Sequence, residues 1–306
     1  MEFCSKSTSA PSFGDAYRAC TLCPRKCGAD RATRTGFCGM TDELRISRVG
    51  LHMWEEPCIS GKTGSGTVFF TGCSLGCIFC QNHEISQRNR LPGRAYTVEQ
   101  FADAMLDLQA QGANNINFVT GTHFVPHIIE GVRIARANGL TIPTLYNCGG
   151  YESVETIKAL EGTIDIYLPD MKFFSNEISR KYAHVPDYFE RAKEAIAEMV
   201  RQQPEQCFND DGIMQKGVIV RHLMLPGLLF DTKHVLDYLC ETYGNSITIS
   251  LMNQYTPMPG VPDELSKPLS QDHYRAMIDH LDLMGQENAF IQEGGTVSES
   301  FIPDFE

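Results

Sequence analysis

The segment "GTVFFTGCSLGCIFCQN", residues 66–82, joins a strand-like apolar run to three closely spaced cysteines. Cys73, Cys77 and Cys80 follow the spacing C-x3-C-x2-C, and the segment holds no fourth cysteine. A disulfide would use only two of these thiols, and a closed tetrahedral zinc site requires four ligands. The segment therefore predicts a metal centre that is held by three thiolates and keeps one coordination position free.

The composition of the whole chain limits its partners and its compartment. The 306 residues include 26 Lys and Arg against 38 Asp and Glu, a net charge of −12. This acidic balance argues against nucleic acid or an anionic membrane as the main partner, because both favour a basic footprint. Residues 1–20 show no apolar run typical of a signal peptide, and no stretch of about 18 apolar residues predicts a membrane span. We therefore expect a cytoplasmic chain, in which thiols stay reduced and clustered cysteines bind metal.

Strand-like and helix-like segments alternate along the rest of the chain. One helix pattern, over 97–111, begins with a capping box formed by Thr97 and Gln100. Repeated β–α units at this spacing predict a parallel sheet with right-handed crossovers, in an α/β fold of the partial (β/α)6 barrel type. The predicted strands are 67–72, 115–119, 142–146, 164–168, 216–225, 246–252 and a short one at 288–292, and the predicted helices are 97–111, 125–138, 153–160, 175–202, 231–243 and 272–284.

The predicted topology gives the three cysteines a place in the fold. In parallel barrels the chemistry collects on the loops that follow the carboxyl ends of the strands. The triple-cysteine loop follows the first strand of the repeat. Three thiolates can hold three irons of a 4Fe–4S cluster and leave the fourth iron open to an external ligand.

The C-x3-C-x2-C spacing after a first strand, with an aromatic residue at Phe79, resembles the radical S-adenosylmethionine (SAM) superfamily. The resemblance covers about residues 64–291. Two further segments, "LCPRKCGADRATRTGFCG" at 22–39 and "MWEEPCISGKTGSG" at 53–66, are similar to a branch related to pyruvate formate-lyase activating enzymes. The resemblance implies a 4Fe–4S cluster that binds SAM and cleaves it reductively to a 5′-deoxyadenosyl radical, which abstracts hydrogen from a substrate.

The resemblance also implies which residues contact SAM. Where the superfamily often carries Gly-Gly-Glu for the SAM ammonium group, this chain has Gly121-Thr122-His123, in which Thr122 or a neutral His123 can accept a hydrogen bond. The alternative for His123 is a histidine bonded within its own loop. The other implied cofactor contacts are Phe79, Asn147, Asp170 and Lys172 of "LPDMK" for the ribose and carboxylate of SAM, and Arg221 of "RHLMLPG" for the SAM carboxylate. The alternative for Asp170 and Lys172 is an ordinary Asp–Lys pair at the surface.

Polar residues also end the sixth predicted strand, in "SLMNQYTPMPG" at 250–260. Asn253, Gln254 and Tyr255 would face the open end of a barrel, which makes them substrate-side candidates. A turn alone also requires polar residues of this kind.

A second cysteine group precedes the barrel. Cys20, Cys23, Cys27 and Cys38 offer four thiolates within nineteen residues, enough for a zinc site or a second iron–sulfur cluster. We expect an N-terminal cysteine-rich lobe and lead-in at 1–63, the core at 64–291 and a tail at 292–306. The remaining cysteines are interpreted as buried or unremarkable thiols: Cys4, Cys58, Cys148, Cys207 and Cys240.

Basic residues surround this quartet, and they suggest one of the partners. Arg25, Lys26, Arg31 and Arg34 would offset the charge of a thiolate–metal centre and would dock an acidic electron carrier such as flavodoxin or ferredoxin. Three functions fit the sequence. The first is an activase that forms a glycyl radical on a partner enzyme, the second is a radical SAM enzyme for a small molecule or peptide, and the third is a non-catalytic metal-binding or electron-transfer module.

Overall fold

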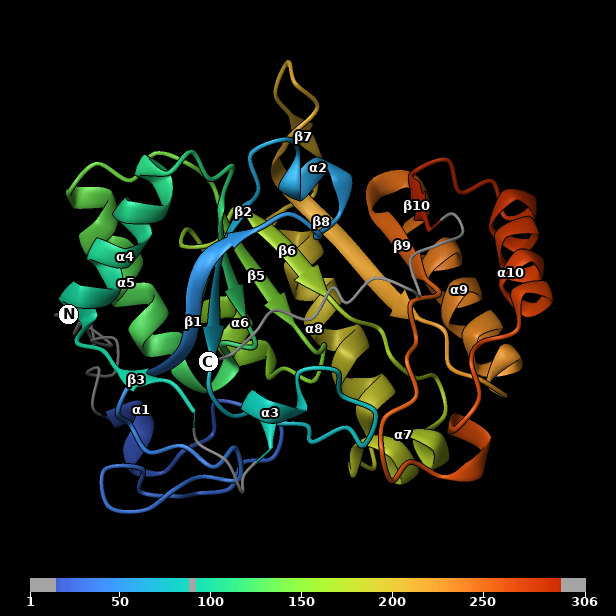
Figure 1. Ribbon diagram of the computed structural model, residues 1–306, viewed down its shortest axis with the longest axis horizontal. Coiled ribbons are helices and arrows are strands. Elements are labelled where there is room, and N and C mark those ends of the chain that lie inside the picture. Colours follow the sequence, from blue (N-terminus) through green and yellow to red (C-terminus); the bar gives the residue numbers. More distant parts are fainter. Residues whose placement is uncertain (1–14, 88–91, 293–306) are drawn as a thin grey trace, which may run out of the picture.

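A mostly parallel sheet forms the centre of the molecule (Figure 1). The computed structural model describes residues 15–87 and 92–292, so Cys4 and residues 293–306 of the predicted tail lie outside the described residues. The strands are β1 (Arg45–His52), β2 (Ser65–Phe70), β3 (Arg94–Ala95), β4 (Ile116–Val119), β5 (Thr144–Cys148), β6 (Ile166–Pro169), β7 (Cys207–Phe208), β8 (Met214–Leu223), β9 (Thr248–Met252) and β10 (Ala289–Ile291). Among the described residues, β2-β4-β5-β6-β8-β9-β10 run parallel in that order, and β1 lies antiparallel against β2. The predicted partial barrel is confirmed.

Helices cover the outer face of the sheet. Thr97 and Gln100 form the predicted capping box, in which each side chain accepts from the backbone N–H of the other residue. In the part of the chain that the structure describes, no helix has the length and apolar character that crossing a membrane requires. The helices are α1 (Asp15–Arg18), α2 (Pro57–Ser60), α3 (His83–Ser86), α4 (Val98–Ala110), α5 (Val125–Ala137), α6 (Val154–Ala159), α7 (Asn176–Ala183), α8 (Tyr188–Gln202), α9 (Leu229–Tyr243) and α10 (Gln271–Leu283).

Apolar side chains pack on both faces of the sheet. Between the sheet and the helices, Phe70, Phe101, Phe118 and Phe124 meet with ring centroids 5.8–6.4 Å apart. A smaller apolar cluster lies inside the barrel, where α2 contributes two side chains and closes the amino end of the strands. Its members are Cys58, Ile59, Leu145, Ile166, Leu168, Met214 and Ile219.

The predicted helix over 175–202 is wrong as a single element. The structure has two helices there, α7 and α8, separated by four residues. His184 takes a left-handed conformation with φ 57° and ends α7. Pro186 follows, and proline disfavours the helical conformation of the residue before it and has no N–H to donate. The break brings the end of α7 against the cysteine loop, where the Ile78 N–H donates to the Tyr182 carbonyl.

Two features of the fold affect access to the site, namely the position of the cysteine-rich residues 15–44 and the free edges of the sheet. Residues 15–44, dark blue in Figure 1, lie below the barrel, at the end to which the arrows of β5, β6 and β8 point. The sheet does not close on itself, because β10 ends one side and β1 with β3 ends the other. The carboxyl end of the barrel is thus covered by the lobe and open along one edge.

Two glycines with nearly the same positive φ provide a test of how tightly the turn after β5 is packed. Gly150 (φ +78°) and Gly162 (φ +75°) both require the left-handed region, but a Cβ on Gly150 would stand 2.0 Å from the Asp170 carbonyl, whereas one on Gly162 meets nothing within 4 Å. We expect Gly162→Ala to lower the free energy of unfolding by about 1 kcal/mol, from backbone strain alone. Gly150→Ala should lower it by about 3 kcal/mol or more, because the clash adds to the same strain. Urea unfolding measures both, and equal losses would contradict the predicted close approach.

Candidate active site

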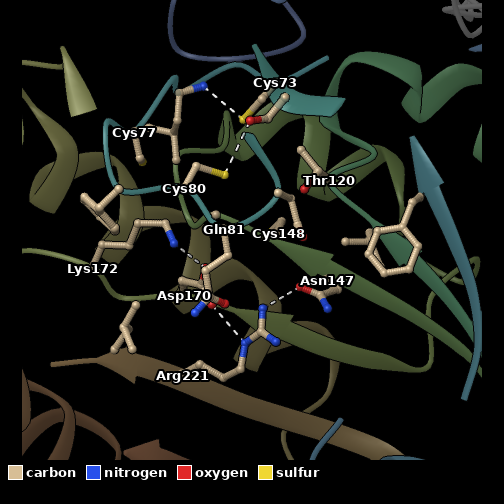
Figure 2. Close-up of a pocket in the computed structure, with 18 of the residues that line it drawn as sticks. Cys73, Cys77, Cys80, Gln81, Thr120, Asn147, Cys148, Asp170, Lys172 and Arg221 are labelled. Carbon is tan, nitrogen blue, oxygen red and sulfur yellow. Dashed lines mark hydrogen bonds and ion pairs between the residues drawn. The ribbon is translucent and has the colours of Figure 1, made fainter. Parts of the chain in front are cut away.

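A cavity of about 230 Å³ lies at the carboxyl ends of the parallel strands. Figure 2 shows the three cysteines at one end of it and Asp170, Arg221 and Asn147 at the other. Most of the residues that the sequence nominates meet on its wall. These are Cys73, Cys77, Phe79, Cys80, Thr122, Asn147, Asp170, Lys172, Arg221 and Gln254.

The loop after β2 holds its cysteines by hydrogen bonds to sulfur. The Leu75 N–H donates to Cys73 Sγ and the Ser86 hydroxyl donates to Cys80 Sγ, each at 3.4 Å. Cys77 is buried, and Cys73 and Cys80 are half-buried. Exclusion of water raises the pKa of Cys73 to about 11 and moves the pKa of Cys77 higher still. These thiols therefore become thiolates only when a metal centre replaces their protons.

A chain of charged side chains crosses the opposite wall. Asp170 accepts from Lys172 Nζ at 2.5 Å and from Arg221 Nε at 2.9 Å, and Arg221 Nη2 donates to Asn147 Oδ1 at 2.6 Å. Burial alone would raise the pKa of Asp170, but Arg221 and Lys172 together outweigh it and hold this pKa below its usual value. Asp170 is therefore ionised at neutral pH, and the predicted Asp–Lys pair is a feature of the cavity wall and not of the outer surface.

Glu55 completes this network, although sequence analysis did not nominate it. One carboxylate oxygen accepts from Asn117 at 3.1 Å and Asn147 at 3.3 Å, and the other lies 3.3 Å from Arg221 Nη1. Burial raises the pKa of Glu55, and the Arg221 charge counteracts that rise. Its only sequence signal is an acidic pair in the otherwise apolar "MWEEPC", ahead of the barrel.

A second buried carboxyl group, Glu152, lies behind the cavity wall. The Thr122 hydroxyl donates to Glu152 Oε1 at 2.7 Å, the Tyr146 hydroxyl lies 3.2 Å from Oε2, and the Cys148 thiol hydrogen-bonds to the same carboxyl group. Burial raises the pKa of Glu152 to about 8, against an ordinary 4.5. Thr122 lines the cavity, but its hydroxyl proton is engaged by Glu152.

Three of the residues nominated for contact with SAM or substrate do not line the cavity. His123 is buried, its Nε2 is 2.8 Å from the Thr71 carbonyl, and burial with the Arg31 charge lowers its pKa to about 3. His123 is thus a neutral histidine bonded between loops, the alternative that the sequence also allowed, and its contact with SAM stays a prediction. Tyr255 is also buried and donates to the Leu265 carbonyl at 2.6 Å, while the Asn253 N–H donates to Gln292 at 2.9 Å. Only Gln254 of the substrate-side candidates reaches the cavity wall.

The structure buries one residue of the predicted basic docking surface fully and a second in part, and docking of an electron carrier stays a prediction. Arg31 is fully buried and donates to the carbonyls of His123, Met40 and Thr41. Arg25 is half-buried and donates to four backbone carbonyls. Two of the four basic residues are therefore structural, because planar guanidinium groups satisfy several carbonyls at once.

The donor set of the cavity fits a 4Fe–4S cluster with SAM. Four cysteines line it, and the Cys148 thiol interacts with the Glu152 carboxyl group, which leaves three thiols for a cluster. Among the described residues, no three His, Cys, Asp or Glu side chains lie close enough together for one metal ion. A cluster differs from a single ion in binding each thiolate through its own iron, which keeps the cysteines farther apart. On the other wall, carboxylates and cations suit the ammonium and carboxylate groups of SAM.

Comparison with known families decides the assignment. The sequence profile of the Radical SAM superfamily matches residues 67–239, which include the cysteine loop and the whole Asp170–Arg221 network except Glu55. The chain belongs to the radical SAM superfamily. Membership makes it a radical SAM enzyme and implies a 4Fe–4S cluster and SAM as cofactors. The narrower relationship to pyruvate formate-lyase activating enzymes stays a prediction.

Known proteins are similar to this chain in sequence and in fold. An uncharacterized protein of Methanocaldococcus jannaschii is 30% identical over 247 residues, which are 79% of this chain and 67% of the relative. The crystal structure of methylornithine synthase superposes with a TM-score of 0.50 at 18% identity, over 71% of this chain and 60% of that one. Native anSMEcpe with bound AdoMet gives a TM-score of 0.50 at 14% identity, over 72% of this chain and 61% of that one. The chain thus spans about three fifths of these two proteins, and at such identities the likeness concerns the fold.

The ionised Asp170 generates a prediction for SAM binding by this radical SAM enzyme. Asp170→Asn keeps the size of the side chain but removes the charge that orients Lys172 and Arg221. We expect SAM affinity to fall by about tenfold or more, the effect of one charge-assisted hydrogen bond, with the iron content unchanged. Asp237→Asn, which breaks an ion pair with Lys233 on α9, is the matched control. Unchanged SAM affinity by equilibrium binding would show that the Asp170 carboxylate does not orient SAM.

The raised pKa of Glu152 predicts how stability depends on pH. Between its ordinary pKa of 4.5 and its folded pKa of about 8, the folded chain holds a proton that the unfolded chain has lost. The free energy of unfolding should therefore fall as pH rises through this window, by up to about 1.4 kcal/mol per pH unit from this group. Glu152→Gln has no such titrating group. The free energy of unfolding of this variant, measured in urea, should therefore rise relative to that of the wild type from pH 5 to pH 8. Parallel pH profiles would mean that Glu152 titrates normally.

Proposed function

We propose that this radical SAM enzyme acts on a peptide segment of a partner protein, as an activase that takes hydrogen from a glycine. The observation that supports the proposal is the outer end of the cavity, whose lining continues from the cysteine loop to His52 and Trp54. Trp54 is 60% exposed and the neighbouring Met53 is 43% exposed. Exposed Trp and Met are enriched where proteins bind other proteins. An exposed apolar rim at the mouth of the cavity therefore favours a polypeptide over a small metabolite.

The two walls of the cavity divide the work. Asp170, Lys172 and Arg221 are held in a fixed geometry by their mutual ion pairs, so they bind and orient the charged groups of SAM without reorganisation. A 4Fe–4S cluster with SAM bound supplies, on reduction, a 5′-deoxyadenosyl radical that takes hydrogen from carbon. Apolar side chains elsewhere in the lining exclude water from the reacting atoms, and these are Phe69, Val119, Leu223 and Met252.

Glycine is the substrate residue that we favour. Glycine has no side chain, so its Cα approaches a wall more closely than that of any other residue. The proposal also includes a one-electron donor of flavodoxin or ferredoxin type and the cytoplasm as compartment, where thiols remain reduced.

Anaerobic reconstitution followed by SAM cleavage with dithionite tests the proposed activity. We expect 5′-deoxyadenosine from the wild type and none above background from Cys77→Ala, because that variant lacks one cluster ligand. A glycine-deuterated peptide or partner enzyme should then pass deuterium into 5′-deoxyadenosine. Deuterium transfer only from a small molecule would replace the activase assignment, and absence of any cleavage would leave a non-catalytic metal-binding module.

Trp54 offers a direct readout of the peptide end of the cavity, since it is the only tryptophan in the chain. Binding of the substrate polypeptide should change its fluorescence emission. Trp54→Ala should raise the KM for the polypeptide by about tenfold or more, as expected for an interface tryptophan. Leu283→Ala is the control, because this side chain is 85% exposed on α10 and does not line the cavity. Equal KM values for both variants would place the substrate elsewhere.

A further inference from the structure

The four N-terminal cysteines lie near one another without a helix or strand between them, although no three of their side chains have the spacing of ligands around one metal ion. The Cys20 thiol hydrogen-bonds to Cys27, and Cys23 and Cys38 lie close enough to Cys20 to interact electrostatically. A Cβ on Gly36 would stand 3.4 Å from Cys38 Sγ and 3.5 Å from Cys27 Sγ, so this glycine leaves room between two of the sulfurs.

The backbone around these cysteines points N–H groups at sulfur. Cys23 accepts from the N–H of Arg25, Cys27 from that of Ala29, and Cys38 from that of Met40. Each donor lies two residues after its cysteine, as Leu75 does for Cys73 in the cluster loop. Hydrogen bonds of this kind stabilise the thiolate form that a metal requires.

Two glycines allow this arrangement. Gly28 follows Cys27 with φ +61°, and Gly39 follows Cys38 with φ +83°. The left-handed conformation, which glycine adopts without a steric penalty, turns the next N–H back toward the sulfur. The sequence repeats Cys-Gly at both places, so the two turns are built alike.

We infer that Cys20, Cys23, Cys27 and Cys38 form a second, closed metal site, and that Arg25 couples this site to the Cys73–Cys80 loop. Four thiolates hold a zinc ion or an iron–sulfur cluster and leave no position open for SAM. Such a site is distinct from the three-cysteine centre in the cavity, because its ligands all come from residues before the barrel.

Arg25 lies between two of the proposed ligands and contacts the cluster loop directly. Its guanidinium group donates to the carbonyls of Ser74 and Leu75, each at 3.0 Å, and to the His184 carbonyl at 2.9 Å. Phe37, which precedes Cys38, stacks on the same guanidinium 3.8 Å from its ring centroid. Arg25 therefore fixes the backbone between Cys73 and Cys77, and its own backbone lies in the chain between the quartet members Cys23 and Cys27.

A second contact joins the same two segments. A Cβ on Gly72 would stand 2.6 Å from the Cys38 carbonyl, so the quartet backbone packs against the residue that precedes Cys73. Closure of the quartet around a metal orders Arg25 and Cys38 together, and both then support the cluster loop. Arg25 is a positioning residue in this scheme, since it reaches the cluster only through the loop carbonyls.

Metal analysis of the Cys73→Ala/Cys77→Ala/Cys80→Ala protein tests the second site without any cluster in the cavity. We expect either about one zinc, or about four irons with visible absorbance, to remain per chain. Adding Cys27→Ala should remove that metal. A triple variant that is folded by circular dichroism but free of zinc and iron, or a metal that Cys27→Ala leaves in place, would overturn the site.

The coupling is tested in the chain with all cysteines present. Arg25→Ala should keep the second metal but release cluster iron to a chelator at least about tenfold faster, because each lost charge-assisted hydrogen bond contributes enough for that factor. Arg18→Ala removes the same charge from a side chain that is 78% exposed, and it should release iron at the wild-type rate. Arg25→Lys should restore little, since one ammonium cannot span three carbonyls. Equal release rates for Arg25→Ala and Arg18→Ala would overturn the coupling.

Discussion

Asp170 and Arg221 meet inside the barrel, where the main chains and the side chains of two neighbouring strands are bonded at one point. Asp170 follows β6 and Arg221 lies in β8, and the Met171 N–H donates to the Arg221 carbonyl at 2.8 Å beside the 2.9 Å ion pair. Removing one partner of a buried pair leaves an uncompensated charge, which costs about 3–5 kcal/mol. Lys172, Asn147 and Glu55 satisfy the remaining donors and acceptors, so each depends on this pair for its position. The strands and the cofactor wall of the cavity are therefore held by the same interaction.

Two carboxyl groups of the site show that burial alone does not set the pKa of a carboxyl group. Asp170 and Glu152 are both buried, but two cations face Asp170, whereas only hydroxyl and thiol groups surround Glu152. Burial raises a carboxyl pKa, and a nearby cation lowers it by more when it is close and shielded from water. The first carboxyl group is therefore ionised and can orient a cation such as the SAM ammonium. The second keeps its proton at neutral pH and serves the wall of the cavity as a neutral hydrogen-bonding group.

Local patterns in the sequence predicted the fold. The site was predicted less completely, because it depends on contacts between residues that are far apart in the sequence. The strand and helix periods, the Thr97 capping box and the cysteine spacing are properties of a few adjacent residues, and the structure has all of them. The break at Pro186 was also local, and proline chemistry could have revealed it. Glu55 could not be found in this way, because it precedes the barrel and reaches Arg221 across 166 positions of the chain. For Arg31 the local pattern was misleading. A charged residue in a basic segment predicts exposure to solvent, but the structure buries this side chain.

The burial of Arg31 explains why the lobe at residues 15–44 is held against the barrel although its only regular element is the four-residue helix α1. Its guanidinium group satisfies the carbonyls of Met40 and Thr41 within the lobe and that of His123 in the barrel, while Tyr17 and Phe124 pack on its faces. Irregular backbone carries many carbonyls that no regular ladder pairs, and a buried carbonyl without a partner is costly. One planar group with five donors meets that requirement at several carbonyls at once. A lobe built from turns can therefore lie against the carboxyl end of the barrel, where it covers the cysteine loop from the side opposite the strands.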